Sequence, residues 1–154
     1  MPADLKNFIT ELLALLEVEV GALEVTTGHR TVIAVDSPDS SLLIGPRGEH
    51  LKALNTIARR MVEQKHGEEA ASFLIDVNGF HEMEMEKVRA AARMLAQRAR
   101  LFKHDVELAP MSAYERLVVH ELFADDPEIK TESSGEGKFR HIVLKYKDSA
   151  LAES

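Results

Sequence analysis

The octapeptide Ile44-Gly45-Pro46-Arg47-Gly48-Glu49-His50-Leu51 contains a Gly-x-x-Gly turn that lies between an apolar run and an amphipathic segment. Two glycines remove the side chains from both ends of the turn, so a sugar-phosphate backbone can approach the main chain closely. The helix expected from Glu49 onward directs its free N–H groups and the positive end of its dipole at the turn. Arg47 adds a positive charge and a planar set of donors that suit phosphate. The stretch therefore predicts an anion-binding turn, although paired glycines also occur in loops for steric reasons alone.

The elements around this turn are expected in a definite order. Apolar residues at helical spacing predict helices, and short β-rich runs bounded by turn residues predict strands. In chain order they are a helix at 4–17, strands at 22–27 and 30–36, a short helical turn at 41–44, a helix at 49–66 and a strand at 72–77.

This order resembles a type II KH domain (αββααβ), a fold of the α+β class. In that family the turn between the two central helices holds the nucleic-acid backbone, and about four nucleotides lie along an apolar groove. Many family members place a basic residue where this chain has Pro46, which lacks an N–H to donate, so weaker binding is expected. The resemblance implies that the RNA-binding residues here are Ile44, Gly45, Pro46, Arg47, Gly48, Leu51 and Lys52.

A long helix is expected at 80–104, and it carries a basic stripe. Arg89, Arg93 and Arg100 share one face with Gln97, away from the expected core face. A charge run on a helix is ordinarily a solvated face. The absence of any acidic residue from Lys87 to Lys103 favours a surface that tracks phosphates instead.

The remaining chain is expected to form a strand at 105–108, a helix from a capping box at Ser112 and Glu115 to about 123, and strands at 129–134 and 139–146. Arg116 and His120 are four residues apart and share a side of this helix. That side is expected to lie nearly opposite the core face, so both residues should contribute little to stability. The predicted core face contains Tyr114, Leu117, Val118 and Leu122.

The segment Met111-Ser112-Ala113-Tyr114-Glu115-Arg116-Leu117-Val118-Val119-His120, with residues 131–137 and Arg140 after it, looks like the R-xxx-H single-stranded nucleic-acid-binding domain. The resemblance implies that Arg116 holds phosphate or stacks on a base, that His120 donates or stacks, and that Lys138 and Arg140 add cations.

A KH domain followed directly by an R-xxx-H domain is the arrangement of the bacterial Jag family, also called SpoIIIJ-associated or KhpB proteins. The resemblance implies a KH domain with its N-terminal helix at 1–79, an R-xxx-H domain at 80–147 that includes the long connecting helix and a three-stranded sheet, and a tail at 148–154. The extra N-terminal domain of many members is not expected in this chain.

The predicted function is capture of single-stranded RNA by backbone clamping and base stacking, in a cytoplasmic regulator or chaperone of bacterial RNA metabolism or translation. The residues do not distinguish RNA from single-stranded DNA. The family resemblance also implies association with a smaller KH protein. The alternative is a ribosome-associated assembly or protein-docking module with weak direct RNA binding, which the net charge of −7 favours.

Other functional classes find little support among the 154 residues. With no cysteine, the chain has no thiolate nucleophile or disulfide, which fits a reducing cytoplasm. No nucleophile–base set, cofactor motif or trusted metal-ligand spacing is present, so neither an enzyme nor a small-molecule substrate is predicted. The stretch 134–138 resembles a phosphate loop, but Glu132 and Phe139 stand where such a loop needs glycine and Ser or Thr. Neither a secretory signal nor a membrane span is expected.

Overall fold

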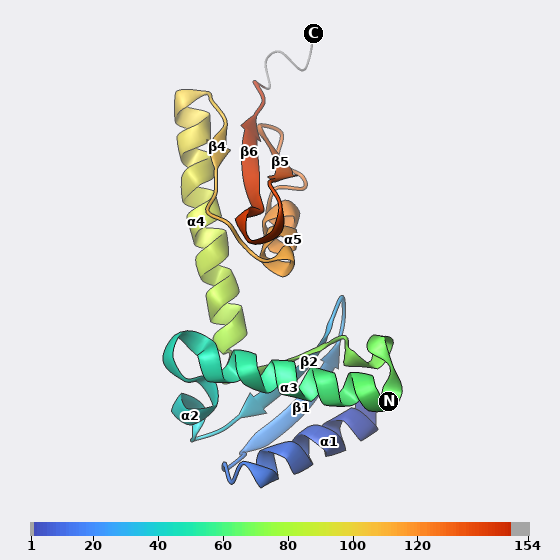
Figure 1. The fold of residues 1–154 in the computed structure, drawn as a ribbon. Helices are drawn as coiled ribbons and strands as arrows, with labels where there is room; N and C mark the ends of the chain where they lie inside the picture. Colours follow the sequence, from blue (N-terminus) through green and yellow to red (C-terminus); the bar gives the residue numbers. More distant parts are fainter. Residues whose placement is uncertain (1, 149–154) are drawn as a thin grey trace. The chain divides into compact units, whose positions relative to one another are not determined.

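The computed structural model describes residues 2–148, and the chain divides into two compact units, residues 1–81 and 82–154 (Figure 1). Most of the predicted tail, 149–154, lies outside the described residues. Among the described helices none is long and apolar enough to cross a bilayer.

The first unit has the element order predicted for a type II KH domain, which confirms the fold prediction. Strand β2 pairs antiparallel with β1 and parallel with β3, giving the sheet order β1-β2-β3. A parallel pair requires a crossover, and the two helices between β2 and β3 provide it. The elements are α1 (Pro2–Leu15), β1 (Ala22–Thr27), β2 (Thr31–Asp36), α2 (Ser40–Ile44), a 3₁₀ turn η1 (Pro46–Gly48), α3 (Glu49–His66), a 3₁₀ turn η2 (Glu68–Ala71) and β3 (Phe73–Val77).

Helices α1 and α3 cover one face of this sheet (Figure 1). Ile9 and Leu13 of α1 and Ala58 of α3 are fully buried in one cluster with Ile33 and Ile75 of the sheet. The predicted apolar faces were too broad at their edges: Leu15 and Leu16 of α1 and Ile57 and Met61 of α3 are exposed. The core therefore uses a narrower stripe of each helix than apolar spacing alone indicates.

A buried amide fixes α3 against the edge strand β3. The Asn55 side chain accepts a hydrogen bond from the Ile75 N–H (2.7 Å) and donates to the Ile75 carbonyl (2.9 Å) and to the Leu51 carbonyl (3.0 Å). Because a buried polar group is costly unless it is bonded, this arrangement selects one position of α3 along the strand. It thereby fixes the helix that follows the glycine turn.

The second unit is a three-stranded antiparallel sheet with helices packed against it (Figure 1). Helix α4 (Phe80–Phe102) begins within the residues of the first unit; β4 (Val106–Glu107), α5 (Ala113–Leu122), β5 (Ile129–Ser134), a 3₁₀ turn η3 (Gly137–Phe139) and β6 (His141–Tyr146) follow, and the strand order is β4-β6-β5. Ala92, Ala96 and Ala99 are fully buried in the core of this unit. Phe102, predicted to be a core residue, is 61% exposed at the end of α4.

Candidate nucleic-acid interface

The glycine turn has left-handed backbone at three of its four residues. Gly45 (φ 70°, ψ −179°), Arg47 (φ 56°) and Gly48 (φ 76°) all have positive φ. The Gly48 N–H bonds to the Gly45 carbonyl (3.2 Å) and closes the turn. Helix α3 begins directly afterwards at Glu49, as predicted, and Gly48 supplies no side-chain cap.

Both glycines are required by side chains that pack on them from within the first unit. A Cβ at Gly45 would lie 2.3 Å from Cγ of His50, and one at Gly48 would lie 2.6 Å from Cε1 of Phe80. The His50 ring is itself held, because its Nδ1 lies 2.8 Å from the Leu42 carbonyl oxygen. The absence of side chains thus serves internal packing as well as an open approach to the main chain.

The exposed groups of the turn are Pro46, Arg47 and the start of α3. Arg47 forms an ion pair with Glu49 at 2.9 Å, with the two side chains 83% and 59% exposed. Such exposed pairs contribute about 0–1 kcal/mol, so a phosphate can replace Glu49 at small cost. Lys52 is also exposed one turn along the helix. This end of α3 combines a positive helix terminus with two accessible cations.

The two apolar residues predicted to line a groove occupy different environments. Leu51 is only 5% exposed and belongs to the core cluster, so it supports the turn from inside and does not line an open groove. Ile44 is half-buried and packs against the same cluster. The sequence did not separate these roles because a groove residue and a core residue show the same apolar spacing.

The basic stripe of α4 is largely neutralised within its own unit. Arg89 pairs with Glu82 (2.7 Å) and Glu86 (3.3 Å), and Arg93 pairs with Glu86 (3.1 Å). Arg93 and Arg89 lower the pKa of the Glu86 carboxyl, and Glu82 raises the pKa of Arg89. The acids come from earlier turns of the helix, before Lys87, so a count of acids inside the stripe did not reveal them.

Arg100 has a structural role. Its guanidinium pairs with Asp126 and lies 3.7 Å from Glu128, and these side chains are only partly exposed. The other carboxylate oxygen of Asp126 accepts the N–H groups of Glu128 and Ile129. Arg100 thus links α4 to the loop before β5, and a free phosphate-tracking role along α4 is not supported for it.

The helix α5 begins as predicted, and its first turn lies beside the hairpin between β5 and β6. The capping box of Ser112 and Glu115 is present in both directions. The Arg116 guanidinium donates to the Met111 carbonyl (2.8 Å), and Met111 N–H in turn bonds to the Arg140 carbonyl (3.1 Å). Arg116 and Lys138 line one surface depression together with the N-terminus of α5.

Arg140 and Lys138 differ in how they are held. The Arg140 guanidinium donates to the Gly135 carbonyl at 2.8 Å and braces the hairpin. Lys138 is exposed, and its amine lies 5.3 Å from the ring centroid of Phe139. The sequence prediction had passed over Phe139 because it considered that position only as a missing phosphate-loop hydroxyl.

The expected exposed position of His120 is wrong. Its Nδ1 lies 2.6 Å from Thr131 Oγ1 and its Nε2 lies 3.0 Å from Ser133 Oγ, so the imidazole joins α5 to β5. The side chain is partly buried, and Leu117, predicted to be in the core, is 46% exposed instead. The buried face of α5 is rotated towards Val118 and Val119, which brings His120 onto the sheet.

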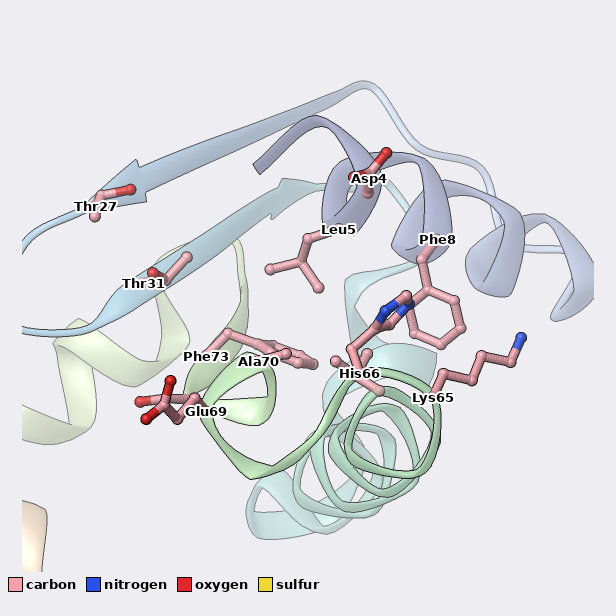
Figure 2. A pocket seen from close by; sticks show the side chains of 12 residues that line it. Asp4, Leu5, Phe8, Thr27, Thr31, Lys65, His66, Glu69, Ala70 and Phe73 are labelled. Carbon is pink, nitrogen blue, oxygen red and sulfur yellow. The ribbon is translucent and has the colours of Figure 1, made fainter. Parts of the chain in front are cut away.

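The main apolar pocket of the first unit lies away from the turn, around the last residues of α3 (Figure 2). It has a volume of about 380 Å³ and lies among Leu5, Phe8 and Phe73, with Lys65 and His66 from the end of α3. The turn is at the other end of this 18-residue helix, roughly 27 Å away at 1.5 Å per residue. No group of three or more potential metal ligands occurs within residues 2–148.

Comparison with known proteins gives two concordant findings. The family model of the R-xxx-H domain matches residues 83–146. The RNA-binding protein KhpB of Clostridium symbiosum is 30% identical over 109 residues, which cover 71% of this chain and 49% of that protein. KhpB of Bacillus subtilis is 31% identical over 110 residues, which cover 70% of this chain and 52% of that protein. The chain spans about half the length of these relatives.

Proposed function

We propose that this chain, a relative of the Jag (KhpB) proteins with an R-xxx-H domain, binds single-stranded RNA by non-covalent contacts and performs no chemistry on it. The observation that carries the proposal is the Gly45–Gly48 turn, which His50 and Phe80 hold from inside while Arg47 stays exposed at the start of α3. A helix N-terminus beside a cation on a fixed turn is suited to phosphate. The relatives' printed description as RNA-binding proteins supports the same class of ligand.

The proposed mechanism uses both units. At the first, Arg47 exchanges its ion pair with Glu49 for a phosphate, and Lys52 reaches a neighbouring one. At the second, Arg116 and Lys138 provide cations around one depression. Arg89, Arg93 and Arg100 already have carboxylate partners, so we assign them a smaller share of the binding than the unpartnered stripe would have had.

The wider role that we propose is regulation or chaperoning of RNA in bacterial cytoplasm, with a smaller KH protein as a partner and single-stranded DNA as a competing ligand. The similarity to KhpB proteins supports the family setting of this role. The regulatory target is not specified by any residue described above.

Charge reversal at the turn tests the proposal. Replacing Pro46 and Arg47 by aspartate places two negative charges against the RNA backbone, and we expect affinity for a single-stranded RNA oligomer to fall about tenfold, equivalent to 1.4 kcal/mol. Because both side chains are exposed, the fold should survive. Fluorescence anisotropy with a labelled oligomer measures the affinity, and circular dichroism verifies folding.

The matched control is Lys6→Asp/Asn7→Asp, which changes two adjacent exposed residues on α1. It makes the same change in net charge within the same unit, so it separates a local contact from a general loss of attraction. We expect the control to bind within about twofold of the parent, a difference of less than 0.5 kcal/mol. Equal binding by the folded turn variant and the parent would remove the turn from the mechanism.

A further inference from the structure

The hairpin between β5 and β6 presents an aromatic ring to solvent. Phe139 is 66% exposed, although it is the last residue of the 3₁₀ turn η3 and adjoins a well-paired strand. A single exposed apolar residue is common on protein surfaces, so exposure alone is no evidence of a site. The surroundings of the ring carry the inference.

The backbone of Phe139 is held on both sides. Its N–H bonds to the Glu136 carbonyl (3.1 Å), and its own carbonyl oxygen lies 3.0 Å from Nδ1 of His141. A Cβ at Gly135, where φ is 85°, would lie 3.0 Å from the same carbonyl oxygen, so the hairpin closes tightly at this point. A ring on a fixed turn loses little conformational entropy when a ligand stacks on it.

Cations lie next to the ring on the side of α5. The Lys138 amine is 5.3 Å from the ring centroid, within the range of a cation–π contact. Lys138 also lines the depression that contains Arg116. The acid in this depression, Glu115, is engaged by the Ser112 N–H in the capping box. The ring therefore lies beside a surface that suits a phosphate.

We propose that Phe139 is a stacking platform for one nucleobase of single-stranded RNA, with the adjoining phosphate held by Lys138 and Arg116. The inference rests on the proposed function and adds the base contact of the second unit. Stacking on an aromatic ring is tolerant of base identity, because every base offers a π face. This contact accordingly adds affinity without selecting a sequence.

The chain contains no tryptophan, so Phe139→Trp introduces a single fluorescent reporter at the platform. We expect its emission to be quenched when a single-stranded RNA oligomer is added. A ribose-phosphate oligomer of equal length without bases should bind through its phosphates yet leave the emission unchanged. Equal quenching by the two oligomers would overturn stacking at this position.

Removal of the ring gives an independent readout. Phe139→Leu keeps an apolar side chain but has no π face, and we expect affinity for the RNA oligomer to fall between about fivefold and a hundredfold. The matched control is Phe102→Leu, since Phe102 is the other strongly exposed phenylalanine among the described residues of this unit, at 61%. The control should bind like the parent.

The outcomes separate the inference from the proposed function. If the parent binds RNA and Phe139→Leu binds equally well, the platform is wrong and the proposed function stands. If the parent does not bind single-stranded RNA, both fail. If Phe139→Leu and Phe102→Leu weaken binding equally, the loss reflects general surface change and the platform is likewise overturned.

Discussion

Replacement of Gly45 by alanine is expected to lower the free energy of unfolding by roughly 2–4 kcal/mol. The backbone at Gly45 (φ 70°, ψ −179°) lies in a region essentially restricted to glycine, where another residue costs about 1–3 kcal/mol. The new Cβ would also displace the His50 ring and break its hydrogen bond to the Leu42 carbonyl, which contributes about 1 kcal/mol. Urea denaturation measures the change, and RNA affinity should fall as the turn shifts.

Gly67→Ala is the matched control for this prediction. Gly67 ends α3 with a similar backbone (φ 88°, ψ 170°), but a Cβ there would meet nothing within 4 Å. The two variants therefore share the backbone strain and differ in the collision with His50. In a His50→Ala background, the excess cost of Gly45→Ala over Gly67→Ala should disappear. If the two substitutions cost the same in the parent, the ring does not hold the turn.

Replacement of His120 by alanine is expected to destabilise the protein by roughly 1–3 kcal/mol, because both imidazole nitrogens bond to hydroxyl groups of β5. Glu121→Ala changes the next residue on α5, which is exposed, and should stay within about 0.5 kcal/mol of the parent. Thermal and urea unfolding provide the comparison.

A double-mutant cycle isolates the contact with β5. His120→Ala and Thr131→Val should be non-additive, with a coupling of about 0.5–3 kcal/mol, because each removes one partner of the same hydrogen bond. Additive effects, together with a His120→Ala variant as stable as Glu121→Ala, would contradict the link between α5 and β5. His120 would then be free to contact RNA, as the sequence had suggested.

Local patterns predicted most of the backbone. Helix α3 has the predicted bounds, Glu49–His66, since apolar spacing and the glycines on either side mark both ends. The capping box at Ser112 likewise specifies the start of α5 through residues three positions apart. Such features depend on neighbours in sequence, which a pattern contains in full.

Side-chain partners that come from distant residues could not be predicted in the same way. The carboxylate of Asp126 reaches Arg100 from 26 residues further along the chain, and the hydroxyls of Thr131 and Ser133 reach His120 from another element. A shift of the buried face of α5 by one residue was enough to turn His120 from solvent towards the sheet. Spacing narrows the orientation of a helix, and packing decides it.

The central claim is that phosphate contacts lead the binding of single-stranded RNA, and the salt dependence of affinity tests it most directly. Three to five neutralised phosphates predict a slope of about −2 to −3.5 for the logarithm of the association constant against the logarithm of salt concentration. Anisotropy titrations of one single-stranded RNA oligomer with the unmodified chain, repeated across a range of salt concentrations, give this slope. A value in that range supports the account, and a slope near zero would contradict it.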